Sequence, residues 1–332
     1  MDIKKYVLNL SKKSKKKVIL PESFDERVIR AAHMLTEDGI ASVILPTHNI
    51  KILKKNGYKI GINLDKIEII EIDINLLDKD KVEKFIDARR KKNISRQDSI
   101  DLLEKNLYFS MMYLKSGKCN ACVCGAVYDT TDVLRAGFHV IGPAEGIDTV
   151  SSYFLMIPPK NHTVIKEPIF FADCAVNPEP NSIELRDIAI LSVKNFKKLF
   201  PNRFANVSML SFSTKGSANN KVLSKIIEAT EFLKNFFARE DDINVDGEFQ
   251  FDAAIIPSVG KRKAPNSSIS GKSNIMIFPD LNSGNIGYKI AERLGGFQAL
   301  GPVLQGLDLP VSDLSRGSSS DDIYLISSIL LL

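Results

Sequence analysis

The sequence has no long hydrophobic run. None of its apolar stretches approaches the roughly 18 residues needed to cross a bilayer. The longest, residues 323–332, contains two serines and predicts a final buried helix. The lysine-rich start has no apolar segment followed by a small-residue cleavage site, which an export signal would show. We therefore expect a cytoplasmic protein that does not bind membranes.

Cysteine is scarce, with 4 residues in 332. Cys119, Cys122 and Cys124 lie close together, but tetrahedral zinc needs four ligands, and the nearest histidine, His139, lies beyond a predicted strand and helix. Cys122 and Cys124 alternate with alanine and valine, which is typical of a buried strand in which cysteine acts as a small hydrophobe. We expect reduced core thiols and no metal site.

Signals for nucleic-acid binding are also missing. Much of the net charge of +5 comes from lysines in the first 17 residues. No aromatic residues are interleaved with them and no recognition module follows, so the lysines indicate the solvated face of a leading helix and not a nucleic-acid site. A mildly positive protein also fits an enzyme that acts on polyanionic phosphate compounds.

The length and composition indicate two globular domains. The chain has 332 residues, of which 44% are apolar and 26% charged, and one hydrophobic core seldom supports so many residues. In the first part, a helix over residues 26–37 is capped by Ser23 or Asp25 and ends at Gly39. Strands are predicted at residues 18–21, 42–45, 67–72 and 119–125, and a long polar helical region at 79–117. This alternation predicts a parallel sheet.

Glycine and proline at residues 142–146 mark a turn where the first domain ends. Beyond it, a return crossing is predicted at 297–309, after which the last helix packs on the first domain. Strands are predicted at residues 153–156, 169–174, 207–212, 251–256 and 274–278. The prediction is an α/β fold with two doubly wound domains and mostly parallel sheets. The first domain comprises residues 1–147 and 308–332, and the second comprises 148–307.

Polar residues follow three of the predicted strands, where parallel sheets bind ligands and where helix N-termini favour anions. None of these loops has the glycine and lysine spacing of a Walker A loop or a dinucleotide fingerprint. Each is compatible with an ordinary turn and cap, but three together favour phosphate binding. The candidate residues are Thr130 and Thr131, Ser213 and Thr214, and Asn285, Tyr288 and Lys289.

The most informative segment is residues 310–323, because it places a hydroxyl, a guanidinium and a carboxylate within eight positions, at Ser315, Arg316 and Asp322. Ser318 or Ser319 can cap the final helix, so an ordinary acidic helix start is the alternative interpretation. That alternative does not explain Arg316, since a cation near a helix N-terminus is unfavourable unless it faces an anion.

With this segment the chain resembles the phosphate acetyltransferase (phosphotransacetylase) family over nearly its full length. It departs from the family pattern at Ser318, often cysteine in relatives, at Asn93, usually glycine, and at Ser312, where asparagine is common. Asn93 tolerates a left-handed backbone. The matching blocks are residues 19–22, 88–92, 132–135, 171–178, 209–218, 263–266, 278–281, 284–289 and 314–317 (Leu-Ser-Arg-Gly).

The resemblance implies an acyltransferase of acetate metabolism, with acetyl-CoA and phosphate in equilibrium with acetyl phosphate and CoA. Transfer would be direct within a ternary complex, without an acyl-enzyme. The resemblance also implies an isocitrate/isopropylmalate dehydrogenase-like architecture with a cleft between two domains, a homodimer, and functional coupling to acetate kinase. CoA and acetyl-CoA would be substrates, and no tightly bound cofactor is expected.

By its place in the family's motif, Asp322 resembles the general base for the CoA thiol. Ser315 resembles the hydroxyl that orients this thiol, and Arg316 resembles the group that stabilises the developing oxyanion and phosphate. Arg89 and Arg135 resemble the family's arginines that bind CoA or phosphate groups. These roles fit the chemistry, because a thiol with a pKa of about 8.5 is mostly protonated at neutral pH and benefits from a base. Arginine also matches phosphate oxygens in pairs.

Three alternatives remain open on the sequence. A phosphate acyltransferase for longer groups such as butyryl would carry the same motifs, since one methylene changes discrimination by only about 1–3 kcal/mol. A metal-dependent dehydrogenase of similar architecture would need an aspartate cluster and a nucleotide-recognition loop. A non-catalytic relative would bind CoA without transferring acetyl groups.

Overall fold

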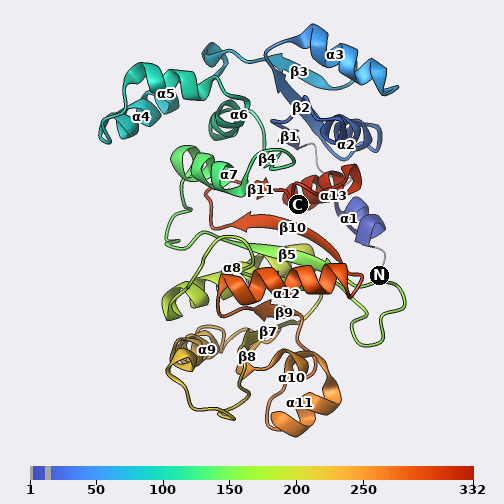
Figure 1. Cartoon of the computed structure of the whole chain (residues 1–332), viewed down its shortest axis with the longest axis vertical. Helices are drawn as coiled ribbons and strands as arrows, with labels where there is room; N and C mark the ends of the chain where they lie inside the picture. Colours follow the sequence, from blue (N-terminus) through green and yellow to red (C-terminus); the bar gives the residue numbers. More distant parts are fainter. Residues whose placement is uncertain (1–2, 12–15) are drawn as a thin grey trace. The chain divides into compact units, whose positions relative to one another are not determined.

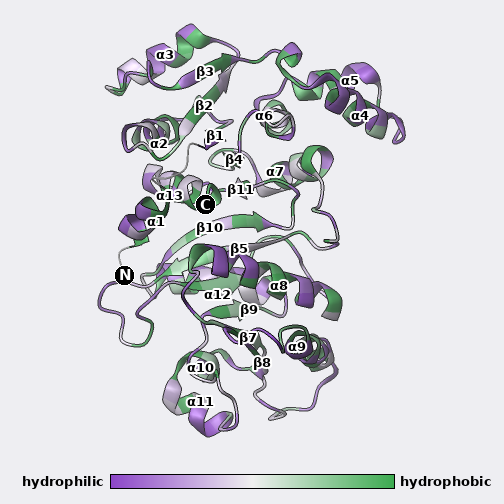
Figure 2. Cartoon of the chain, turned by 180° about the vertical axis from the view of Figure 1, so that it is seen from behind, coloured by the Kyte–Doolittle hydropathy of each residue, from purple (hydrophilic) through white to green (hydrophobic). Residues whose placement is uncertain are grey.

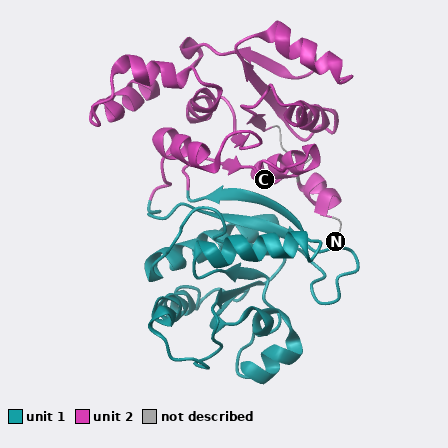
Figure 3. Ribbon diagram, in the orientation of Figure 1, with its two compact units in different colours: residues 1, 146–306 teal, residues 2–145, 307–332 magenta. Residues whose placement is uncertain are grey.

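The computed structural model describes residues 3–11 and 16–332, and the chain forms two compact units (Figure 3). Residues 146–306 are here called the central unit. The terminal unit comprises the described residues up to Glu145 together with Leu307–Leu332. None of the described helices is both long and apolar enough to span a bilayer.

The strands of the terminal unit are parallel and follow the order β3-β2-β1-β4-β11 (Figure 1). The first four confirm the strands predicted before residue 126. β11 comes from the far end of the chain and pairs with β4, so that Asp313 lies opposite Cys124. The bounds are β1 (Lys17–Ile19), β2 (Ser42–Thr47), β3 (Glu68–Glu71), β4 (Ala121–Cys124) and β11 (Val311–Asp313).

Helix α2 (Glu26–Glu37) forms as its sequence predicts. The Asp25 side chain accepts the backbone N–H of Arg27 as N-cap, and Gly39 beyond the C-terminus has a φ of +64°, which glycine adopts without steric cost. The helix buries residues at helical spacing, among them Val28 and Leu35. The cap at its start fixes where the Arg27 side chain emerges.

The helical region predicted at 79–117 is helical but not continuous, and its last part is not polar. It consists of α4 (Lys79–Arg90), α5 (Arg96–Leu103) and α6 (Asn106–Lys115). The first break contains Asn93 with a φ of 60°, the left-handed conformation that its side chain was expected to tolerate. Residues 107–114 of α6 are all buried, because this helix packs against β4 and β2. Figure 2 shows hydrophilic residues along α4 and α5.

The final helix, α13 (Ser320–Leu330), is buried from Ile323 to Leu330 and packs on α1 and α2. This confirms the predicted buried helix, and each leucine or isoleucine buried there stabilises the fold by about 1.5–3 kcal/mol. The predicted leading helix is α1 (Ile3–Ser11), whereas Lys12, Lys13 and Lys15 lie outside the described residues. The other helices of this unit are α3 (Ile50–Lys59), α7 (Thr130–Ala136), the 3₁₀ turn Ile74–Leu76 and the π-helical turn Gly137–Ile141.

The strands of the central unit follow the order β10-β5-β6-β9-β7-β8. From β6 to β8 the pairs are parallel, whereas β5 runs antiparallel to both β6 and β10. The sheet is therefore mostly parallel, and its antiparallel pairings are those of β5 with β6 and with β10. The bounds are β5 (Ser151–Ile157), β6 (Ile169–Ala172), β7 (Ala205–Leu210), β8 (Ile243–Phe249), β9 (Ile275–Ile277) and β10 (Gln298–Gln305).

Helices cover both faces of this sheet. Neighbouring residues of a strand point to opposite faces. Phe170 of β6 packs edge-on against Phe196, with ring centroids 5.3 Å apart, and Phe171 packs against Phe251, at 5.7 Å. Phe196 belongs to α8 and Phe251 to α10, so the two faces are covered by different helices. The helices are α8 (Ser182–Leu199), α9 (Ser224–Phe236), α10 (Phe251–Ile255), α11 (Pro257–Lys263), α12 (Leu281–Arg293) and the 3₁₀ turn Lys221–Leu223.

One strand prediction for this unit is wrong, and strands β8 and β10 were not predicted. The apolar stretch at 251–256 is not a strand but mostly helix α10, which buries Ala253 and Ala254. The strand is β8, where Asp246 and Glu248 interrupt the hydrophobic pattern. The return crossing predicted at 297–309 is largely strand β10, which pairs with β5 despite its glycine and proline because its register shifts between Leu300 and Val303.

Candidate functional site

The Leu-Ser-Arg-Gly loop begins where β11 ends, beside the end of β4. The two strands are parallel, so their carboxyl ends lie at the same edge of the sheet. Leu314 donates its N–H to Cys124 O at 2.6 Å. Gly125 has a φ of +101°, and a Cβ there would lie 2.2 Å from Asp313 Oδ1 and 2.4 Å from Leu314 N. The absence of a side chain at Gly125 therefore allows the two loops to approach this closely.

Glu22 shapes the loop after β4. Its carboxylate is 1% exposed and accepts the backbone N–H groups of residues 125–128, at 3.2, 3.0, 2.7 and 2.9 Å in chain order. Burial raises the pKa of Glu22, and these four N–H groups oppose the shift. The carboxylate turns the backbone donors of this loop inward. Glu22 lay in a matching block, but no role was predicted for it.

Arg27 joins the same loop to the one after β11. Its Nη1 donates to the carbonyl oxygens of Arg316, at 2.8 Å, and Ser318, at 2.9 Å, and its Nη2 donates to Ala126 O at 2.7 Å. The Asp25 carboxylate orients the guanidinium by accepting two further hydrogen bonds, from Arg27 Nε and Nη2. The planar fork of arginine suits this task, since one lysine ammonium would not reach three carbonyls in fixed directions. Sequence patterns gave no signal for this role.

Two of the side chains expected to meet the substrate, Arg316 and Ser315, are exposed. Arg316 Nη1 pairs with Asp129 Oδ1 at 2.8 Å, and the two side chains are 73% and 60% exposed. An exposed ion pair contributes little to stability. Ser315 Oγ accepts the N–H of Gly317 at 3.3 Å, and its residue is exposed. Both side chains can therefore exchange these contacts for a ligand at small cost.

Asp322 lies in the first turn of α13 and forms a capping box with Ser319. Its carboxylate accepts Ser319 N–H at 2.9 Å and Ser319 Oγ–H at 2.8 Å, and Ser319 Oγ accepts Asp322 N–H at 3.2 Å. Of the two predicted caps, the structure selects Ser319, whereas Ser318 is buried. The carboxylate thus stabilises the helix start in this structure.

Thr130 and Thr131 are the first residues of α7, after the N-cap Asp129. This is the strand-end position that the sequence predicted. Thr131 is exposed, whereas Thr130 is half-buried, and its Oγ1 lies 2.6 Å from Asp313 Oδ2 in a hydrogen bond. The structure therefore brings Thr130 next to the last residue of β11.

Arg89 and Arg135 both lie near His139. Arg89 Nη1 is 3.2 Å from His139 Nδ1, which is also 3.1 Å from the hydroxyl of Tyr108. Burial lowers the pKa of His139, and Arg89, Lys92 and Arg135 add to that effect by charge repulsion. The two arginines from α4 and α7 thus belong to one positively charged region of the terminal unit, as binding of an anionic ligand requires.

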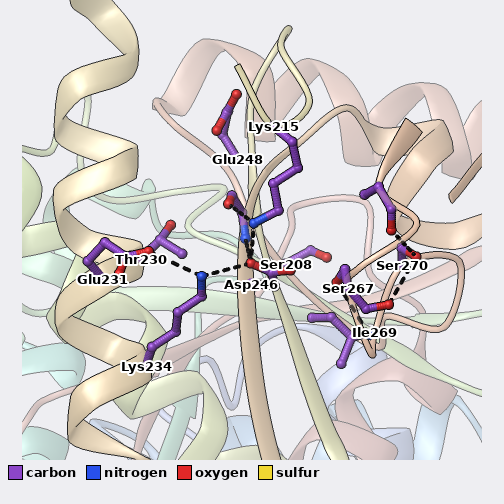
Figure 4. A network of polar contacts seen from close by, with 12 residues as sticks. Ser208, Lys215, Thr230, Glu231, Lys234, Asp246, Glu248, Ser267, Ile269 and Ser270 are labelled. Atoms are coloured by element: carbon purple, nitrogen blue, oxygen red, sulfur yellow. Dashed lines mark hydrogen bonds and ion pairs between the residues drawn. The ribbon is translucent and has the colours of Figure 1, made fainter. Parts of the chain in front are cut away.

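Ser213 and Thr214 lie in the loop after β7 in the central unit, and both are buried. Ser213 Oγ donates to Glu248 Oε1 at 2.8 Å, and Thr214 Oγ1 accepts the N–H of Gln250 at 2.9 Å. Lys215 pairs with Asp246, which also pairs with Lys234 at 3.1 Å (Figure 4). The loop is thus closed by bonds within its own unit.

The prediction of a loop before a helix is wrong for Asn285, Tyr288 and Lys289. Asp280 caps α12 at Leu281, so these residues form part of the helix. Tyr288 stacks on Phe154, with ring centroids 4.1 Å apart, and Asn285 donates to Cys174 O at 3.2 Å. Only the exposed Lys289 of this group presents a charge to solvent. The glycines in the segment gave a loop signal, but Gly284 is needed for close packing against Asp173.

The cysteines lie in the interior. Cys119, Cys122, Cys124 and Cys174 are all buried free thiols, and burial raises the pKa of Cys119, Cys124 and Cys174. Within residues 3–11 and 16–332, no group of three or more His, Cys, Asp or Glu side chains is arranged to hold a metal ion.

The fold and the site define an α/β protein suited to an anionic substrate. A serine-arginine loop and threonine hydroxyls follow strand ends, and helices α4 and α7 supply further arginines. Residues 2–330 match the phosphate acetyl/butaryl transferase family. The chain belongs to this family, whose members transfer acyl groups.

Individual relatives agree with the family match. A phosphate acetyltransferase from Thermoanaerobacterium thermosaccharolyticum is 40% identical over 97% of this chain and 96% of its own length. A solved phosphotransacetylase from Streptococcus pyogenes has a TM-score of 0.89 at 37% identity and covers 100% of this chain and 98% of that one. A Salmonella typhimurium structure described as a 4-hydroxythreonine-4-phosphate dehydrogenase has a TM-score of 0.52 at 10% identity, over 96% of this chain and 100% of that one. This last likeness concerns the fold alone.

Proposed function

We propose that the chain catalyses the reversible transfer of an acetyl group between CoA and inorganic phosphate. The observation that carries the proposal is the loop at residues 314–317, which presents exposed Ser315 and Arg316 side chains at a strand end in a member of an acyl-transferring family. Relatives about 40% identical are named phosphate acetyltransferases, which favours acetyl over longer acyl groups.

In the proposed reaction the CoA sulfur attacks the carbonyl carbon of acetyl phosphate. A carbon–sulfur bond forms, the carbon–oxygen bond to phosphate breaks, and the thiol proton passes to Asp322. Ser315 orients the thiol, and Arg316 stabilises the oxyanion and the departing phosphate. Asp322 must release Ser319 or share its carboxylate between the helix cap and the thiol, because the two bonds from Ser319 converge on Asp322 Oδ2.

The arginines supply the proposed binding contacts for phosphate groups. Arg89 and Arg135 would hold phosphates of CoA or the substrate phosphate, because both belong to the charged region around His139. Thr130 and Thr131 are proposed as hydroxyl donors at the neighbouring strand end. In the central unit, the proposed contacts with CoA are Lys289, through its exposed ammonium, together with Ser213, Thr214, Asn285 and Tyr288.

The substrate is tested by comparing acetyl phosphate with butyryl phosphate as donors to CoA, following thioester formation. We expect kcat/KM to be higher for acetyl phosphate. A higher value for butyryl phosphate would establish the longer-chain alternative. Normal CoA binding without transfer of either group would establish a non-catalytic relative.

The finer points are proposals too. We propose that the two units are the two domains, with boundaries near residues 147 and 308, and that the protein works as a cytoplasmic homodimer coupled to acetate kinase. Buried free thiols support a reducing compartment. We also propose that catalysis needs no tightly bound cofactor or metal, which predicts full activity after treatment with a chelator and dialysis.

A further inference from the structure

Asp313 is a buried carboxyl group directly before the Leu-Ser-Arg-Gly loop, and the proposed mechanism gives it no role. It is the last residue of β11 and is 0% exposed. Its Oδ2 lies 2.6 Å from Thr130 Oγ1 and accepts the hydroxyl hydrogen of Thr130 when the carboxyl is ionised. Its Oδ1 is buried and has no hydrogen-bond partner among the described residues, and it faces the bare Cα of Gly125.

The surroundings of Asp313 disfavour a negative charge. The ionisable groups that act on it are Glu22, between β1 and α2, and Asp129, at the start of α7, and the Cys124 thiol of β4 also interacts with it. No ion pair joins Asp313 to a cation in the described part of the chain. Burying an unpaired carboxylate is costly. Burial raises the pKa of Asp313 to about 7, Thr130 opposes the shift, and the charges of Glu22 and Asp129 add to it.

The protonation state of Asp313 decides what Thr130 can do. An ionised carboxylate only accepts hydrogen bonds, so it would take the single proton of the Thr130 hydroxyl. A neutral acid can donate its own proton to Thr130 Oγ1, which leaves the hydroxyl hydrogen of Thr130 free for another acceptor. Thr130 is half-buried at the strand end, three residues after Val127, whose N–H is already bound to Glu22.

We propose that Asp313 is a positioning residue, held as a neutral acid that donates to Thr130, so that the Thr130 hydroxyl donates to a phosphate oxygen of the bound substrate. This inference rests on the proposed function, because it assumes a phosphate-bearing substrate beside the Leu-Ser-Arg-Gly loop. Asp313 itself touches no reacting atom. It acts by turning the hydroxyl of Thr130 outward, and it loses this effect when it ionises.

The first test is the pH profile of kcat/KM for acetyl phosphate in the wild type and in Asp313→Asn, whose amide mimics the neutral acid. We expect the ratio of wild type to variant to fall about tenfold as pH rises from 6 to 8, the effect of about one hydrogen bond to an anion. Taking the ratio cancels ionisation of the CoA thiol and of groups common to both proteins. A ratio that stays constant with pH would overturn the proposal.

Substitutions at Thr130 test the other half of the pair. Thr130→Ser keeps the hydroxyl, and we expect it to retain activity within about threefold, whereas the isosteric Thr130→Val should raise KM for acetyl phosphate about tenfold. Equal KM values in the two variants would remove Thr130 from substrate binding. This comparison does not depend on whether Asp313→Asn folds.

A spectroscopic measurement separates failure of this inference from failure of the proposed function. The infrared difference spectrum between wild type and Asp313→Asn should show the carbonyl band of a protonated carboxylic acid at pH 6, which disappears by pH 8. This measurement needs no substrate, so it tests Asp313 even if the wild type transfers no acetyl group. A carboxylate band at pH 6 would refute the neutral acid.

Discussion

The burial of Asp313 predicts a stability that depends on pH in a defined direction. The pKa of its carboxyl rises from an ordinary 3.8 to about 7 in the folded chain. A raised folded-state pKa means that, as pH rises, the unfolded chain loses the Asp313 proton before the folded chain does. The contribution of the protonated Asp313 to the free energy of unfolding is therefore complete below about pH 4 and is lost as pH rises to about 7. At about 1.4 kcal/mol for each pKa unit, the loss amounts to about 4 kcal/mol.

Asp313→Asn removes this titration and leaves the others in place. Glu22 also has a raised pKa and His139 a lowered one, but both are present in the two proteins and largely cancel in the difference. We therefore expect the free energy of unfolding of the variant, relative to wild type, to increase by about 1.4 kcal/mol per pH unit between roughly pH 4.5 and 6.5.

The assay is urea unfolding followed by far-UV circular dichroism at intervals of pH, with the same slope fitted for both proteins. Asp246→Asn is a matched control in the central unit. Burial raises the pKa of that carboxyl, but hydrogen bonds from Lys215, Ser267 and Gly247 and the charge of Lys215 lower it by more. In the wild type, the stabilisation that comes from the ionised Asp246 carboxylate should be lost as pH falls, whereas that from Asp313 is lost as pH rises. A stability difference for Asp313→Asn that does not change with pH would refute the argument that the buried acid is neutral.

Three further changes test the site. Asp322→Asn should lower turnover a hundredfold or more with little change in CoA affinity, whereas Asp321→Asn, which alters an exposed carboxylate on the same turn, should leave turnover unchanged. Arg27→Lys should lower turnover about tenfold, because lysine cannot hold three carbonyls of two loops at once; unchanged steady-state rates would show that the loops keep their positions without it. Glu22→Gln should reduce the free energy of unfolding by about 2–3 kcal/mol, because one of the four N–H donors that Glu22 accepts then faces an amide NH₂. The exposed control Glu71→Gln should change the free energy of unfolding by less than about 0.5 kcal/mol. Equal urea midpoints for the two variants would contradict this prediction.

The elements that could be predicted from the sequence are those set by local signals. Helix α2 has its cap at Asp25 and its stop at Gly39 within the segment itself. Residues 251–256 misled the prediction because a short apolar run has no period that separates strand from helix. Asn285 was placed in a loop because glycines surround it, whereas the requirement for glycine comes from packing of Gly284 against Asp173.

The candidate site was predicted as a set of side chains, but not as a structure. Ser315, Arg316 and Asp322 followed from one short segment and from resemblance to the family. Glu22 and Arg27 could not be found in this way, because their partners in the two loops lie 99 or more positions away, for example at Ala126 and Arg316. Such contacts depend on which strands become neighbours in the sheet. The sequence of a single strand does not contain that information.

The central claim is direct acetyl transfer between CoA and phosphate in a ternary complex. Its most direct test is the exchange of isotopically labelled phosphate into acetyl phosphate by the purified protein, measured with and without CoA. The proposed mechanism predicts rapid exchange when CoA is present and none when it is absent, because no acyl group is carried by the protein. Exchange without CoA would show an acyl-enzyme, and absence of exchange under both conditions would contradict the proposed activity.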